Sequence, residues 1–426
     1  MELPGKAGAF DMMPSTLTAR RQWPATFRSL RYPNYRRWFV GQSLSLMGTW
    51  MQSVAQGWLV YQLTGSKLAL GMISFAGSIP TLFLMIPAGA LADRIPRRRL
   101  LLMTQSTMMV LAFALAALSA TKVLQVWQIA LLAFLGGVAN SFDAPARQAL
   151  AVDLVEDRRD LQNAIALNST MFNLARVIGP AIGGIALASL GASWCFAING
   201  LSFLAVLIAL FFMQFPALAA SSHTERLAAQ IRAGLGYVWH TTSVRTIVAL
   251  VAVSSLFGMA YGVLMPVYAA DILRVGEAGL GALNAAVGVG ALIGALVAAT
   301  MSRDPRKGLQ LTLGSLVFPV AMLCFAFSRS YVFSLLALCF TGFGFVSQNA
   351  MSNTLVQSLV PDNLRGRVMG VYSLTFFGTV PFGALLTGVL AQAFSPTVSL
   401  AFGASVTLLF ALAVFIMVPS LRQMRV

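Results

Sequence analysis

The chain has 426 residues, of which 58% are hydrophobic and only 10% are charged, whereas about a quarter of the residues of an ordinary soluble domain are charged. So few charged side chains cannot cover so much apolar sequence in water, which excludes a conventional globular enzyme and predicts a membrane protein. The net charge of +16 comes from basic residues between the apolar segments, so we interpret it as membrane topology and expect no nucleic-acid partner.

Twelve segments are long and apolar enough to cross a bilayer, which takes about 20 residues. They lie at 39–63, 67–91, 99–121, 124–148, 161–189, 192–215, 244–272, 278–301, 308–328, 330–357, 366–393 and 396–418. The sequence therefore predicts an all-α membrane protein with twelve transmembrane helices.

The longest connection, 216–243, divides the chain into an N-terminal bundle at 39–215 and a C-terminal bundle at 244–418, with tails at 1–38 and 419–426. Within this connection, residues 225–239 are expected to form an amphipathic helix on the membrane surface. A shift of 205 residues superposes similar positions of the two bundles, such as Gly137 on Gly342 and Asp157 on Asp362. This common offset predicts two six-helix repeats with the same topology, an architecture found in transporters.

The basic residues indicate the orientation of the chain in the membrane. The tails and the even-numbered connections hold 24 of them, and the odd-numbered connections hold four. Because positive residues are retained on the cytoplasmic side, both termini are expected to be cytoplasmic. The first 38 residues lack an apolar core, so no cleavable signal peptide is expected.

Metal, redox and nucleotide chemistry find no support in the sequence. The three cysteines and two histidines match no metal-site or disulfide spacing, and no glycine-rich phosphate-binding loop is present. We therefore expect no cofactor, no metal and no direct drive by ATP. An intramembrane enzyme would need a nucleophile and a base that share a site, and the sequence offers no such pair.

The connection between the second and third segments carries one glycine, one aspartate and several arginines at a characteristic spacing: Gly89, Asp93, Arg94, Arg97 and Arg98. The pattern resembles the loop signature Gly-x-x-x-Asp-Arg-x-Gly-Arg-Arg of the major facilitator superfamily, with a proline in place of the second glycine. The resemblance implies that these residues form a conformational latch, with Asp93 against the start of helix 11. It also implies that Arg97 or Arg98 pairs with an acid near the end of helix 4, for which Asp143 is available. Alternatively, the arginines only fix the topology.

The fifth segment contains a run of small residues around a proline: Gly179, Pro180, Gly183 and Gly184. It resembles the Gly-Pro-x-x-Gly-Gly motif of exporting members of the same superfamily. Small residues permit close helix packing and the proline removes a backbone hydrogen bond, so the motif is expected to act in packing and bending. Simple packing, for example against Gly288, Gly290 and Gly294, is the alternative.

Longer stretches at 41–52, 142–149, 172–176 and 365–369 resemble the bacterial branch that includes enterobactin and macrolide exporters. The resemblance implies a monomeric secondary transporter in the lipid bilayer of the bacterial inner membrane. It also implies export of bulky amphipathic small molecules, drug-like compounds or siderophores, by alternating access coupled to protons. An uncoupled facilitator, a flippase for lipid-like substrates and a receptor or scaffold without transport are the alternatives.

Polar residues at helical spacing mark the helices that would line a central pathway. The expected substrate-pathway residues are Gln42, Thr49, Gln52, Gln56, Asn140, Asn173, Arg176, Tyr261 and Gln348. A face this polar is costly against lipid, so it should face a cavity or another helix. The first interpretation gives a water-filled pathway, and the second gives hydrogen bonds between helices, worth about 0.6 kcal/mol each.

Two charged residues of the membrane segments carry separate hypotheses. Arg176 falls near the bilayer midplane, where a charge is costly, so it should face the interior and either bind an electron-rich substrate group or hold neighbouring helices together. None of the thirteen acidic residues falls at the centre of a predicted helix. Asp143 is the leading candidate for proton coupling, although Arg147 at i+4 would favour its ionised form.

Overall fold

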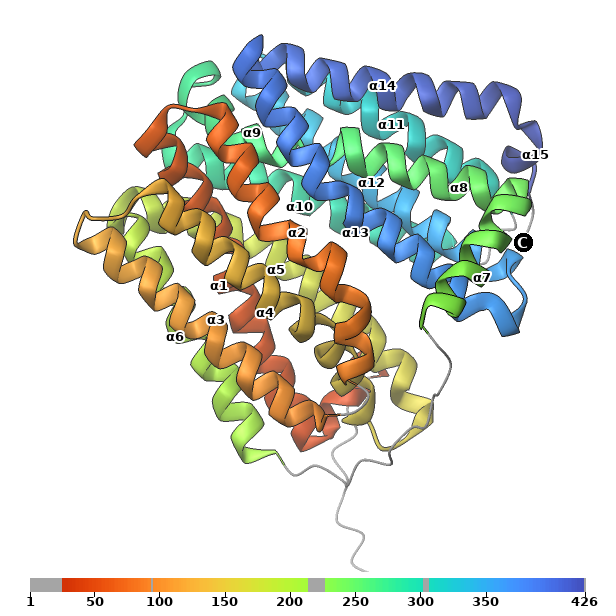
Figure 1. Cartoon of the computed structure of the whole chain (residues 1–426), viewed down its shortest axis with the longest axis horizontal. Helices are drawn as coiled ribbons and strands as arrows, with labels where there is room; N and C mark the ends of the chain where they lie inside the picture. The colour runs from red at the N-terminus through yellow and green to blue at the C-terminus, as the bar shows by residue number, and fades with distance from the viewer. Residues whose placement is uncertain (1–24, 93–94, 214–226, 302–305, 425–426) are drawn as a thin grey trace, which may run out of the picture.

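The computed structural model describes residues 25–92, 95–213, 227–301 and 306–424, and these residues form helices and connections without a strand (Figure 1). The expected latch residues Asp93 and Arg94 lie outside the described residues. Within the N-terminal half the elements are η1 (Ala25–Arg31), α1 (Pro33–Thr64), α2 (Lys67–Ala92), α3 (Arg97–Ala120), α4 (Val126–Asp153), η2 (Arg158–Asp160), α5 (Leu161–Leu190) and α6 (Ala192–Phe212).

The second half begins with α7 (Leu227–His240), which is followed by six spans and a short final helix. The spans comprise α8 (Thr242–Val253), η3 (Ser254–Gly258), α9 (Tyr261–Val267) and η4 (Tyr268–Ile272), then α10 (Gly276–Thr300), α11 (Lys307–Phe327), α12 (Tyr331–Leu359), α13 (Asp362–Ala393) and α14 (Pro396–Met417), with α15 at Pro419–Arg422. The first four of these elements together form the seventh predicted span, and the η3 and η4 stretches within it are π-helical.

Helix ends are set by local chemistry on the side away from the termini. Gly65 ends α1 in the left-handed conformation, with φ of 60°, and its N–H donates to the carbonyl of Tyr61, an ending that favours glycine because it has no Cβ. Ser330 and Ser395 begin α12 and α14, where their hydroxyl groups accept hydrogen bonds from backbone N–H groups three residues later.

Eleven spans are long and apolar enough to cross a membrane within the described part of the chain. Helix α1 has 32 residues and is long enough, but its polar face lowers its mean hydropathy, so it is not among the eleven. It is enclosed by its neighbours in the N-terminal half, since a Cβ at Gly41 would lie 2.8 Å from a carbonyl oxygen of α6. With α1 included, the prediction of twelve transmembrane helices in two six-helix bundles is confirmed.

The repeat predicted from the sequence appears in the packing of equivalent helices. Gly137 packs α4 against the backbone of α2 at Gly77, and Gly342 packs α12 against the backbone of α10 at Val287. Both contacts are backbone to backbone, so neither glycine can gain a side chain without separating its helices. The two halves therefore use the same packing at positions related by the offset.

The two halves meet along two helix pairs, α2 with α13 and α5 with α10. A Cβ at Gly184 of α5 would lie 2.6 Å from the Cα of Gly281 in α10, and a Cβ at Gly388 of α13 would lie 2.9 Å from the Cα of Gly71 in α2. Each glycine lies near the helix end farthest from the chain termini. We call the side that carries η1, α7 and α15 the terminal side, and the other the opposite side. Figure 1 shows the halves joined on the opposite side and diverging toward the terminal side.

Polar contacts reinforce this junction on the opposite side. The hydroxyl group of Tyr61, in α1, donates to the carboxylate of Asp271, in η4. The side-chain oxygen of Gln392, in α13, accepts from the backbone N–H of Lys67 at 3.0 Å. Each of these contacts joins a group of one half to a group of the other, so the opposite side is closed by direct contacts.

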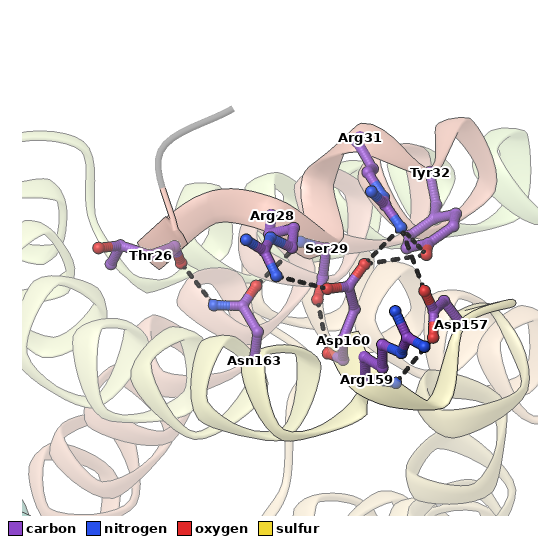
Figure 2. A network of polar contacts seen from close by, with 9 residues as sticks. All are labelled: Thr26, Arg28, Ser29, Arg31, Tyr32, Asp157, Arg159, Asp160 and Asn163. Atoms are coloured by element: carbon purple, nitrogen blue, oxygen red, sulfur yellow. Dashed lines mark hydrogen bonds and ion pairs between the residues drawn. The ribbon is translucent and has the colours of Figure 1, made fainter. Parts of the chain in front are cut away.

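On the terminal side, η1 is fixed to the start of α5 by the polar network in Figure 2. Asp160 is only 1% exposed, and its carboxylate accepts from Tyr32 at 2.9 Å and pairs with Arg31 at 2.8 Å and Arg28 at 3.8 Å. Asn163 accepts from the backbone N–H of Ser29 at 2.9 Å. These contacts attach the segment before α1 to the N-terminus of α5.

The expected amphipathic helix is present as α7, although residues 214–226 before it lie outside the described part of the chain. A Cβ at Gly234 would lie 2.7 Å from the carbonyl oxygen of Arg367 in α13. The helix therefore rests on the C-terminal half.

Candidate substrate cavity

A cavity of about 520 Å³ lies between the two halves. The N-terminal half contributes walls from α1, α2, α3, α4, α5 and α6, and the C-terminal half contributes walls from α9, α10 and α13. Most of the lining side chains are apolar, among them Trp50, Met108, Phe203, Met259 and Val380. The size and the mixture of apolar walls with a few polar groups suit a small-molecule site.

Four of the expected pathway residues line this cavity: Thr49, Gln52, Gln56 and Asn140. Gln52 is held in place by Asn199 of α6, whose amide N–H donates to the side-chain oxygen of Gln52 at 2.7 Å. This contact occupies the acceptor of Gln52 and leaves its amide NH₂ group as a donor for a ligand.

The other expected pathway residues do not line the cavity. Gln42 is 1% exposed, and Asn173 donates to the carbonyl of Ser169 in its own helix at 2.9 Å. Gln348 is fully buried and donates to the hydroxyl group of Ser254 at 2.8 Å. For Gln348 the alternative interpretation, hydrogen bonding between helices, therefore holds. Helical spacing groups residues on one face, but it does not say whether that face meets a cavity or a neighbour.

Arg176 lies next to the cavity without forming its wall. It is one helical turn before Pro180, which lines the cavity, and its guanidinium carbon is 5.8 Å from the ring centroid of Trp50. It also interacts with the hydroxyl group of Tyr261 in the other half, a residue that is 7% exposed. The partners of Arg176 are thus an aromatic face and a phenol.

Several polar residues of the cavity were not singled out from the sequence, including Ser74, Ser78, Asn199 and Asn284. Asn284 is an amide in a helix that is otherwise rich in glycine and alanine, and Asn199 lies in one of the most apolar spans. An isolated amide in such a segment is itself a signal, because burial against lipid would be costly.

Asp143 lies away from the cavity, inside the N-terminal half between α3 and α4. It is 0% exposed, and one carboxylate oxygen accepts from Thr104 at 2.9 Å and from Gln105 at 2.8 Å. The other oxygen is 3.6 Å from Arg147, the neighbour that the sequence indicated.

The described residues of the second connection make contacts within the N-terminal half. Arg97 forms an ion pair with Asp153 at the end of α4, and Arg98 donates to the carbonyl of Phe211 at 3.0 Å. Arg97 thus pairs with an acid near the end of helix 4, as the resemblance implied, but that acid is Asp153 and not Asp143. Asp153 lies ten residues, nearly three turns, further along α4, close to the start of α3. No described atom lies within 4 Å of a Cβ built at Gly89, so no close helix approach occurs there in this conformation.

The glycines of α5 pack in two directions. A Cβ built at Gly179 would lie 2.6 Å from the Cβ of Trp50, and a Cβ built at Gly183 would lie 2.9 Å from the Cα of Met51. Both positions therefore face α1. Gly184 faces α10, and Pro180 contributes its carbonyl oxygen 2.6 Å from a Cβ built at Gly281.

The packing partners suggested for this motif are correct only in part. Gly288 does face α5, with a Cβ 2.7 Å from the carbonyl oxygen of Arg176, but Gly290 and Gly294 face α12. Gly281, about two turns before Gly288, is the glycine that contacts Gly184 of the motif across the halves.

Comparison with known proteins gives a consistent result. Residues 24–425 match the family described as transmembrane secretion effector. The multidrug efflux pump Tap of Mycolicibacterium fortuitum is 31% identical over 88% of this chain and 93% of its own length. The staphyloferrin A transporter of Staphylococcus aureus is 26% identical over 84% and 89%, and the enterobactin exporter of Escherichia coli is 25% identical over 95% and 97%.

Solved structures share the fold. A POT family transporter in complex with 5-aminolevulinic acid superposes with a TM-score of 0.74 at 12% identity, covering 91% of this chain and 96% of the other. A bacterial homologue of the human lysosomal transporter Spinster, in an inward-facing and unoccupied conformation, gives a TM-score of 0.67 at 14% identity over 94% and 97%.

Proposed function

Because the chain belongs to the transmembrane secretion effector family of major facilitator transporters, we propose that it exports bulky amphipathic small molecules from the cytoplasm. Drug-like compounds and siderophores are the two substrate classes, as the names of its relatives suggest. The observation that carries the proposal is the cavity between the halves, with its polar face on α1 and its apolar walls.

The proposed orientation makes the terminal side cytoplasmic and the opposite side extracellular. The distribution of basic residues supports it. The contacts of Tyr61 with Asp271 and of Gly184 with Gly281 then close the extracellular side, which corresponds to a state that loads substrate from the cytoplasm. Export follows when residues 39–215 and 244–418 rock as two bodies and the closed side changes. We propose that a single chain in the bacterial inner membrane is sufficient for this cycle.

The proposed latch acts in the other state. When the terminal side closes, the second connection approaches the C-terminal half, and Gly89, Asp93 and Arg94 contact the start of α13. Arg97 and Arg98 keep the connection in place, because Arg97 is already bound to α4 and Arg98 to α6.

For proton coupling we propose Asp143. It is a fully buried carboxylate within α4, and its neighbour Arg147 is 3.6 Å away. Protonation of Asp143 would remove this attraction and change the hydrogen bonds with Thr104 and Gln105, which lets a proton alter the packing of α3 on α4. The alternative is an uncoupled facilitator or a flippase for lipid-like substrates.

Transport in sealed proteoliposomes tests the proposal. A pH gradient is imposed, a hydrophobic dye, a macrolide and a catecholate siderophore are offered in turn, and the internal pH is read together with substrate accumulation. Accumulation with counterflow of protons in the wild-type protein, and its loss in Asp143→Asn, is the expected result. Accumulation by Asp143→Asn that matches the wild type would exclude Asp143 as the coupling residue. Equilibration without proton movement would establish the facilitator, and binding without any movement would contradict transport altogether.

A further inference from the structure

The charges in and around the cavity indicate which ligands it prefers. The side chains that line it are apolar or carry neutral amide and hydroxyl groups, and among the described residues no ionisable side chain belongs to its wall. A positive charge lies beside the wall, since Arg176 is one turn from the lining residue Pro180. Its partners, Trp50 and Tyr261, are both uncharged, so this positive charge has no carboxylate beside it within the described part of the chain.

Trp50 connects this charge to the cavity. Its ring lies 5.8 Å from the guanidinium carbon of Arg176 and 6.1 Å from the ring of Phe172, and the same residue lines the cavity. An exposed aromatic face would normally attract a cationic ligand. Here the ring already interacts with a cation, so a second cation on this wall meets the repulsion of Arg176.

We propose that the cavity takes neutral and anionic amphiphiles and rejects lipophilic cations, with Arg176 as the residue that sets this preference. This rests on the proposed export function and narrows its substrate class. Two unit charges roughly 10 Å apart at an effective dielectric constant of about 20 change an equilibrium by roughly tenfold. A cation should therefore bind about tenfold more weakly than a neutral ligand of the same shape, and an anion more tightly.

Three xanthene dyes of one skeleton test the rule: a rhodamine methyl ester as cation, fluorescein methyl ester as anion at mildly alkaline pH, and its methyl ether as neutral ligand. Fluorescence anisotropy with the purified full-length protein in detergent gives the three affinities without any need for transport. The expected order is anion, then neutral dye, then cation. Equal affinities, a preference for the cation, or failure of all three dyes to bind would overturn the proposal.

Variants separate a direct role of Arg176 from a structural one. Arg176→Gln should reduce the ratio of the affinities for the anion and the cation by roughly tenfold or more, and it should leave the affinity for the neutral dye unchanged. Arg176→Lys should keep the wild-type order of affinities. Gln56→Glu adds a carboxylate to the wall with almost no change in shape, so it should raise the affinity for the cation. Arg176→Gln that weakens all three dyes equally, together with Gln56→Glu that does not favour the cation, would overturn the assignment.

The same dyes in proteoliposomes keep this inference distinct from the export function. Transport of all three dyes at similar rates, with equal affinities, would refute the selection rule and leave export standing. Selective binding of the neutral and anionic dyes without movement would support the rule and refute export.

Discussion

The contact between Gly184 and Gly281 gives a direct way to change the balance between the two conformations. We expect Gly184→Ala to destabilise the state closed on the opposite side and to populate the state in which that side is open. The new Cβ would lie 2.6 Å from the Cα of Gly281 and 2.8 Å from the carbonyl oxygen of Glu277. Both neighbours are backbone atoms, so no side chain can rotate away, and the helices themselves must separate.

The size of the effect follows from the overlap. A normal carbon contact is 3.4 to 4 Å, so α5 and α10 must move apart by about 1 Å, and overpacking of this kind costs about 1–3 kcal/mol. Because the contact joins the halves only in the closed state, this cost shifts the conformational equilibrium about 5–150-fold.

Spin labels on the opposite side measure the shift. Positions 123 and 329 are exposed and belong to different halves, and labels at cysteines introduced there report the separation of the halves by pulsed electron resonance. Gly184→Ala should enlarge the long-distance population. Gly388→Ala, at the equivalent contact with Gly71, should have a similar effect.

Gly370→Ala is the matched control. This glycine lies in α13, is exposed, and has no described atom within 4 Å of a built Cβ, so the distances should stay as in the wild type. An unchanged distance distribution in Gly184→Ala, or an equal shift in Gly370→Ala, would refute the reasoning.

Three further outcomes are expected. Asp160→Ala should lower the free energy of unfolding by about 1–3 kcal/mol, because the buried hydroxyl group of Tyr32 loses its acceptor. Asp362→Ala, which breaks an exposed pair, should change it by less than about 1 kcal/mol; equal melting temperatures would contradict this. Gly137→Ala should reduce the stability of the N-terminal half. It should leave the distances between the halves unchanged, and a change in the distances between the same labels would contradict this. Tyr61→Phe removes the hydrogen bond to Asp271 and should favour opening of the opposite side slightly, by less than about 1 kcal/mol; a shift toward closure would contradict it.

The fold was accessible from the sequence because its signals are strong and local. Eleven of the spans are long apolar runs, and the common offset that relates Gly137 to Gly342 indicates the duplication. The exception is the seventh span, which was predicted as one helix and contains two π-helical stretches. Hydropathy indicates whether a segment lies in lipid or in water, but it contains little information on whether its backbone follows the α-helical or the π-helical hydrogen-bond pattern.

The site was accessible only in part, because it depends on which face of each helix meets the other half. Thr49 and Gln56 line the cavity, while Gln348 has the same kind of helical spacing and is fully buried. The partner of Arg97 could not be deduced either, since Asp143 and Asp153 both lie on α4 and the choice between them depends on the crossing point of α3. Such choices are made by long-range packing, which the sequence records only indirectly.

Asp143 and Gln348 occupy the same position in the two halves under the offset of 205 residues. Both are fully buried and hydrogen-bonded inside their own bundle, but one side chain is a carboxylic acid and the other is a neutral amide. The same position is thus polar in both halves, but only the N-terminal half has an acid there. In the proposed cycle, the two halves move in the same way, and only the half that contains Asp143 responds to a proton.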